Sequence, residues 1–171
     1  RLLAEAGWPS GFELEFPARG LFAEAASIVA EMLGRVGIRA HVRALTEAEW
    51  FPAMASGRLT MTVSRFGCPT GDASDLLESA LQTRVAGTKA GLNNYSGYSS
   101  RPLDELIGLA GRTLEMRRRK PYLLEATALV MEDLPLVPLY VDQDLYAFRR
   151  GVEWTPRNDN FLIASEIVRP R

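Results

Sequence analysis

Residues 12–45 read FELEFPARGLFAEAASIVAEMLGRVGIRAHVRAL. Apolar and charged residues alternate over 12–16, which is the period of a strand with one buried face. Apolar residues then recur at helical spacing from 21 to 36, and Gly37 stands where a helix commonly ends. Alternation returns over 38–45. A strand, a helix and a second strand in this order predict parallel neighbours in an α/β sheet, because crossovers of this kind join parallel strands.

The sequence after this unit predicts a larger sheet with further helices. Thr46 and Glu49 form a capping box, which satisfies free amides at the start of a helix that should end near Gly57. Alternation over 59–63 predicts a third strand. The remaining expected elements are helices over 101–115 and 119–132 and strands over 136–141 and 145–148. The predicted fold class is α/β, with a mixed, mostly parallel sheet flanked by helices.

Composition excludes several classes of protein. The chain has 171 residues, 47% of them hydrophobic, which is enough to bury one sizeable core. A formal net charge of -1 gives no reason to expect nucleic-acid binding, and the one dense basic run, 117–120, is interpreted as a solvated helix start. No apolar stretch approaches the roughly 18–20 residues that span a bilayer. A single cysteine, Cys68, excludes an intrachain disulfide and a multi-cysteine zinc site, and neither metal nor cofactor is expected.

A glycine-rich loop is the leading candidate for a binding site. It has the sequence GCPTG, residues 67–71, and it follows the third predicted strand. Asp72 comes next and can cap the helix that follows. In open α/β sheets ligands collect at the carboxyl ends of strands, beside helix N-termini with unpaired amides. The position of this loop therefore predicts a site.

Several segments resemble the extracellular solute-binding proteins of the peptide, oligopeptide and nickel class of ABC importers. They are residues 2–8 with 11–14, residues 32–38, residues 94–99 with 103–106, and residues 132–140. None of these segments is a catalytic signature. Their order matches over essentially the whole chain, which is why the family is identified from them together.

The resemblance implies a two-lobed receptor that closes on a peptide or other small solute and presents it to permease subunits in the membrane. It implies a periplasmic-binding-protein-like lobe of type II over 1–141, and a tail over 142–171 that crosses back to an N-terminal lobe. Residues 1–6 read as the end of a helix already under way, so that lobe and a signal sequence are expected upstream. The full-length protein is expected to be periplasmic, or extracellular and membrane-attached.

The resemblance also implies which residues contact the solute. Peptide-binding members typically carry an aromatic residue in this loop, with an acidic residue three positions later that pairs with the amino group of the peptide. Here those positions hold Phe66 and Pro69, and Pro69 has neither a charge nor an amide hydrogen. Asp72 is an alternative partner for an amine, and capping a helix is its simpler role. The expected solute-binding residues are Phe66, Gly67, Cys68, Pro69, Thr70, Asp72 and Tyr140.

Two other functions stay open on the sequence alone. A ligand-sensing module of the same fold could be attached to a regulator, which only upstream sequence would reveal. A Cys-dependent hydrolase would need Cys68 beside His41, whereas a buried thiol and a half-buried structural histidine are the simpler interpretations. We therefore predict that the chain is not an enzyme. Taken alone it is expected to self-associate, because apolar residues in 145–168 would otherwise pack on the other lobe.

Overall fold

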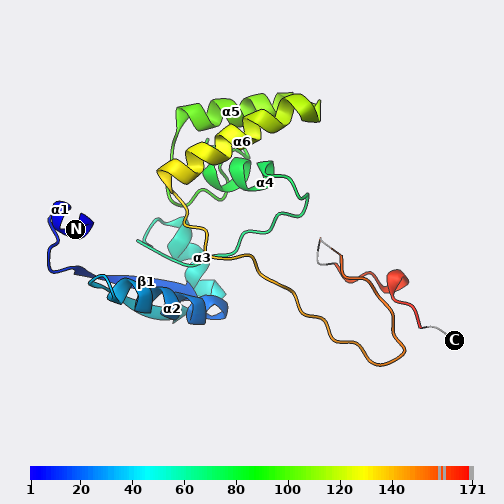
Figure 1. Cartoon of the computed structure of the whole chain (residues 1–171), viewed down its shortest axis with the longest axis horizontal. Helices are drawn as coiled ribbons and strands as arrows, with labels where there is room; N and C mark the ends of the chain where they lie inside the picture. The colour runs from blue at the N-terminus through cyan, green and yellow to red at the C-terminus, as the bar shows by residue number, and fades with distance from the viewer. Residues whose placement is uncertain (158, 160, 170–171) are drawn as a thin grey trace. The chain divides into compact units, whose positions relative to one another are not determined.

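The computed structural model describes residues 1–157, 159 and 161–169. The chain divides into two compact units, Arg1–Phe66 and Gly67–Arg171. Figure 1 shows the helices and strands of each unit. Of the predicted tail, residues 158, 160, 170 and 171 lie outside the described residues.

The first unit is built on a parallel pair of strands. Strands β1 (Phe12–Arg19) and β2 (Ile38–Leu45) run parallel, with Phe12 opposite Ile38 and Arg19 opposite Leu45. The 3₁₀ turn η1 (Gly20–Phe22) and helix α2 (Ala23–Gly34) connect them, so the predicted crossover is confirmed. Side chains of the strands and of α2 form one buried cluster, and its fully buried members are Phe16, Ala18, Phe22, Ala26 and Val63. The short helix α1 (Leu2–Glu5) precedes this unit.

Helix α3 (Glu47–Ala55) begins with the predicted capping box. The Thr46 hydroxyl accepts a hydrogen bond from the Glu49 amide at 3.3 Å, and the Glu49 carboxylate accepts one from the Thr46 amide at 2.9 Å. The hydrogen bonds that the Thr46 amide and then the Thr46 hydroxyl donate to the Glu49 carboxylate lower the pKa of Glu49. The buried Trp50 anchors this helix through an indole N–H that donates to the Thr62 hydroxyl at 3.0 Å.

The third predicted strand is wrong. Residues 59–63 form no strand, although Val63 is buried in the cluster and Thr62 is held by Trp50. Alternation reports which side chains are buried, whereas a strand also needs a neighbour that supplies a backbone ladder. Here side-chain contacts fix the segment.

The predicted half-burial of His41 is also wrong. His41 is exposed, and its Nε2 lies 3.2 Å from the Glu13 carboxylate.

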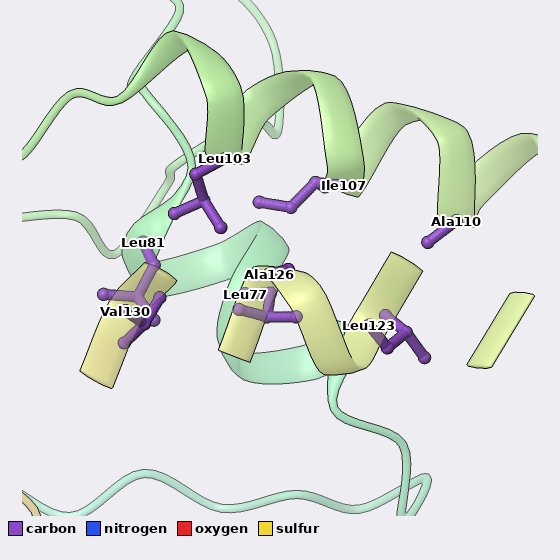
Figure 2. Packing of buried hydrophobic residues seen from close by; sticks show 8 residues of the cluster. All are labelled: Leu77, Leu81, Leu103, Ile107, Ala110, Leu123, Ala126 and Val130. Carbon is purple, nitrogen blue, oxygen red and sulfur yellow. The ribbon is translucent and has the colours of Figure 1, made fainter. Parts of the chain in front are cut away.

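Helices form the body of the second unit. The first two elements are the short helix α4 (Ser74–Leu76) and the π-helical turn η2 (Leu77–Leu81), followed by α5 (Arg101–Arg112) and α6 (Met116–Asp133). The last two helices match the predicted ones closely. Figure 2 shows the side chains from η2, α5 and α6 that pack together. They are Leu77, Leu81, Leu103, Ile107, Ala110, Leu123, Ala126 and Val130.

The polar loop before α5 is tied down by a buried amide. Asn94 is 3% exposed, and its side-chain NH₂ donates to the carbonyls of Gln82 at 2.9 Å and Tyr98 at 2.7 Å. The Tyr98 hydroxyl donates to the Asp133 carboxylate at 2.6 Å and so links this loop to the end of α6. The aromatic residue thus pins the loop to the body of the unit.

The two late strands are also wrong. Leu134 ends α6 in the left-handed conformation, with φ of 48°, and residues 136–149 contain neither helix nor strand. Within the described residues, the tail pairs only at an antiparallel bridge between Glu153 and Val168, with backbone hydrogen bonds of 2.8 and 2.9 Å. A 3₁₀ turn, η3 (Ala164–Glu166), precedes Val168. β-branched and apolar residues predict a strand only where a partner strand is present.

Gly11 should be the least replaceable glycine of the first unit. Its φ is 75°, and a Cβ placed there would lie 1.8 Å from the carbonyl oxygen of Gly37, at the point where β1 and β2 begin. Gly7 has a similar φ of 86° but open space around its Cβ position. Gly7→Ala should therefore lower the free energy of unfolding by at most about 1–2 kcal/mol. Gly11→Ala should lower it clearly more, because the backbone near Gly37 must move as well. Urea unfolding followed by Trp50 fluorescence checks this, and equal losses would contradict it.

Candidate functional site

The 67–72 loop is a closed turn with its own hydrogen bonds. The Gly71 amide donates to the Cys68 carbonyl at 3.1 Å, and Gly71 has φ of 71°, a conformation that favours glycine. The Cys68 thiol donates to the Asp72 carbonyl at 3.2 Å. The Asp72 amide in turn donates to the Thr70 hydroxyl at 3.2 Å. These bonds hold the shape of the loop.

Asp72 anchors this loop to the helical body. The Arg119 guanidinium donates to both carboxylate oxygens of Asp72, at 2.9 Å for Oδ1. The Ser74 amide donates to Oδ1 as well, at 2.9 Å. Arg119 Nε also donates to the Ala110 carbonyl at 3.2 Å, near the end of α5. One arginine therefore joins α5, α6 and the loop.

The side chains of this pair are partly buried. The side chain of Arg119 is 16% exposed and that of Asp72 is 22% exposed. The hydrogen bonds from Arg119, followed by those from Ser74, hold the pKa of the Asp72 carboxyl far below its usual range. The interpretation of the whole 117–120 run as solvated is thus wrong for Arg119, because the helix period turns this residue inward while Arg117 and Arg118 stay exposed.

The helix-capping role expected of Asp72 is met only in part. Its Oδ1 accepts from the Ser74 amide, but the residue preceding α4 is Ala73, which has no side chain to cap with. The ion pair with Arg119 supplies most of the contacts of the Asp72 carboxylate. Its main contacts are thus with an arginine 47 residues away in the chain.

Asp75 supports the loop from its other end. Its Oδ2 accepts from the Thr70 hydroxyl at 2.6 Å and from the Thr70 amide at 3.1 Å. These bonds lower the pKa of Asp75, and the bond from the hydroxyl has the larger effect.

The pKa of the Cys68 thiol is raised, first by loss of hydration and then by the nearby Asp75 carboxylate. A reactive cysteine needs the opposite shift, because the thiolate is the nucleophile. Cys68 is exposed, so it is not the buried thiol that the sequence suggested.

An open cleft of about 550 Å³ lies beside this loop. Its lining residues are Cys68, Pro69, Thr70, Gly71, Arg157 and Asp159. The Arg157 guanidinium donates to both oxygens of Asp159, and to Glu166 at 2.6 Å. Arg157, and then the Phe161 amide, lower the pKa of Asp159 to about 2. Sequence reasoning missed Arg157 and Asp159, because they lie more than 80 positions from the loop residues that line the same cleft.

The structure brings together three of the predicted site residues, Cys68, Pro69 and Thr70. The Asp72 carboxylate binds Arg119 and does not line the cleft. Gly67 is exposed and does not line the cleft either. Phe66 is 41% exposed and is the last residue of the first unit. Tyr140 is 64% exposed in the segment after α6, and it does not line the cleft either. The solute-binding role of these residues stays a prediction.

A second cleft, of about 430 Å³, lies within the first unit at the carboxyl ends of β1 and β2. Its most notable residue is Arg19, which donates to the Glu47 carboxylate. The Arg19 guanidinium carbon lies 5.5–5.6 Å from the ring centroids of Phe22, Trp50 and Phe51, within the range of cation–π attraction. The sequence alone did not indicate Arg19, since two of its three ring partners lie about 30 residues later in the chain, on α3.

The Asp72 carboxylate should make stability depend on pH below about pH 4. Its folded-state pKa is depressed, so its contribution is complete above the unfolded-state value of about 3.9 and is lost as the pH falls toward the folded-state pKa. We expect Asp72→Asn to lower the free energy of unfolding by roughly 1–3 kcal/mol at pH 7, because charged hydrogen bonds are lost. Urea titrations at several pH values should show this difference shrinking below about pH 4. A difference that is the same at low and neutral pH would contradict the assignment.

No described helix combines the length and the hydropathy needed to cross a membrane. Within the same residues, no group of three or more His, Cys, Asp or Glu side chains is placed to hold a metal ion.

Comparison with solved structures identifies similar proteins. The periplasmic binding protein DppA from Helicobacter pylori, in complex with the peptide STSA, is 22% identical with a TM-score of 0.72, over 81% of this chain and 27% of that one. HbpA2 from Haemophilus parasuis is 17% identical with a TM-score of 0.77, over 99% of this chain and 34% of that one. NikZ from Campylobacter jejuni, in complex with Ni(L-His), is 17% identical with a TM-score of 0.61, over 72% of this chain and 25% of that one. No family model and no curated protein matches the sequence.

These matches establish the fold. The chain has the periplasmic-binding-protein-like α/β fold of these structures, and the predicted resemblance is confirmed at the level of the fold. It spans about a quarter to a third of the length of each of the three structures, 25–34%. Of these three proteins, DppA is a periplasmic binding protein.

Proposed function

We propose that this chain is the C-terminal portion of the solute-binding component of an ABC importer of the peptide and nickel class. The observation that carries the proposal is the likeness of fold, with a TM-score of 0.77 over 99% of the chain. In this proposal a peptide-like or other small solute is captured between this lobe and an N-terminal lobe. The closed receptor then delivers the solute to permease subunits.

The proposed site is the cleft beside the 67–72 loop. Its volume of about 550 Å³ is within the range of about 300–1,000 Å³ that is typical of small-molecule sites. The hydrogen bonds that Thr70 donates to Asp75 and that Arg119 donates to Asp72 fix the loop, so little ordering entropy is lost when a solute binds. Residues 1–141 are proposed as the lobe and residues 142–171 as the tail that crosses back. The protein is proposed to work in the periplasm, or outside the cell while attached to the membrane.

Binding without turnover is part of the proposal. The raised pKa of Cys68 keeps its thiol protonated at neutral pH, and its hydrogen bond goes to a backbone carbonyl rather than to a base. Esterase and amidase assays of the chain should therefore show no activity that is lost in Cys68→Ala.

Native mass spectrometry of the protein that carries this chain tests the proposal. We expect one small solute per protein to be retained through purification and released on unfolding. Tandem mass spectrometry of the released molecule then identifies its class. A protein that retains no molecule, and whose melting temperature no peptide or chelate raises, would contradict the proposal.

A further inference from the structure

The carboxylate of Asp72 is already saturated by donors of the protein. Arg119 donates to both of its oxygens and the Ser74 amide donates to one of them. An external ammonium would have to displace Arg119, whose side chain is only 16% exposed. Leaving one partner of a largely buried ion pair without its counter-charge is strongly unfavourable. This exchange is therefore disfavoured.

The other two carboxylates near the loop have donors as well. Asp75 accepts from the amide and the hydroxyl of Thr70, and it is not among the residues that line the cleft. Asp159 does line the cleft, but it is held by the guanidinium of Arg157. Arg157 also donates to Glu166, which is not among the residues that line the cleft. The charged residues of the described lining are therefore Arg157 and Asp159, and the carboxylate of Asp159 is held by Arg157.

We infer, on the basis of the proposed function, that the part of the solute that meets the 67–72 loop carries no ammonium group. The site selects solutes that are uncharged at this end, such as N-acylated peptides. Arg119 is the residue that sets this preference, because it occupies the one loop carboxylate that the chain could have offered to an amine. An ammonium moved from water into such a cleft without a counter-charge is destabilised.

The test compares alaninamide, whose amine carries an ammonium charge at neutral pH, with N-acetylalaninamide, in which acetylation removes that charge. The ¹⁵N-labelled chain is titrated with each, and the amide resonances of residues 67–75 are followed. We expect alaninamide to shift these resonances no more than its acetylated analogue does. Saturable shifts with alaninamide alone, lost in Asp72→Asn or Asp75→Asn, would overturn the inference.

A gain of binding tests the role of Arg119 itself. Arg119→Met leaves the Asp72 carboxylate unpaired, so alaninamide should then bind at least about tenfold more tightly than to the unmodified chain. The double variant Asp72→Asn/Arg119→Met should lose this gain. A folded Arg119→Met chain that gains nothing would overturn the role of Arg119. If Arg119→Met does not fold, Arg119→Gln is tested in its place. The titration of the unmodified chain tests the main inference whether or not either variant folds.

A failure of the proposed function and a failure of this inference give different experimental results. The proposed function fails if the protein retains and binds no solute, which native mass spectrometry detects. The inference fails only if the loop itself holds an ammonium, which the titration detects.

Discussion

Replacing Leu103 by alanine should destabilise the second unit by about 2–5 kcal/mol, the largest effect expected in this chain. Leu103 is 0% exposed and is one of the eight labelled side chains in Figure 2. Truncation would remove buried methyl groups and leave a cavity between η2, α5 and α6, which close-packed neighbours fill only in part. Urea unfolding followed by circular dichroism at 222 nm measures the loss.

Leu114→Ala is the matched control for this prediction. Leu114 is 97% exposed, in the connection between α5 and α6, so the same truncation removes almost no buried surface there. Its effect should stay within about 0.5 kcal/mol. Similar losses for the two variants would mean that α5 and α6 do not pack as Figure 2 shows.

Arg119→Met should lower the free energy of unfolding of the second unit by about 1.5–3 kcal/mol, the range for hydrogen bonds to charged groups. The change breaks the bonds to Asp72 and Ala110 and leaves a carboxylate that is only 22% exposed without its cation. The amide of Ser74, which donates to Asp72, should also exchange with solvent faster.

Arg118→Met tests whether the effect belongs to the ion pair or merely to charge. Arg118 neighbours Arg119 on α6 and is exposed, so its removal changes the net charge equally without breaking these bonds. We expect almost no loss for Arg118→Met. A loss equal to that of Arg119→Met, or unchanged exchange at Ser74, would contradict the anchoring role of Arg119.

Local sequence predicted the first unit as far as residue 55. The crossover over 12–45 and the capping box at Thr46 depend on short-range periodicity and on side chains that reach their own backbone. Residues 59–63 and 136–148 show the limit of that reasoning. Their apolar patterns are those of strands, but a ladder depends on a partner strand, which a local pattern does not specify.

The site shows the same division between local and long-range information. The 67–72 loop and the proximity of Asp72 to the start of α4 follow from glycine, proline and aspartate at turn positions. Local sequence could not predict the Asp72–Arg119 pair, because its two residues are 47 positions apart. For the same reason it could not predict that Arg157 lines the cleft beside the 67–72 loop. In the basic run, sequence reasoning treated four residues alike, although helical period places Arg119 inward.

A crystal structure of the protein with its solute bound is the most direct test of the central claim that this chain is a solute-binding lobe. We expect the solute in the cleft beside residues 67–72, with contacts to Thr70 or Gly71 and with Asp72 still paired to Arg119. A solute bound away from this loop, or an Asp72 carboxylate that has left Arg119 to hold a solute ammonium, would contradict it.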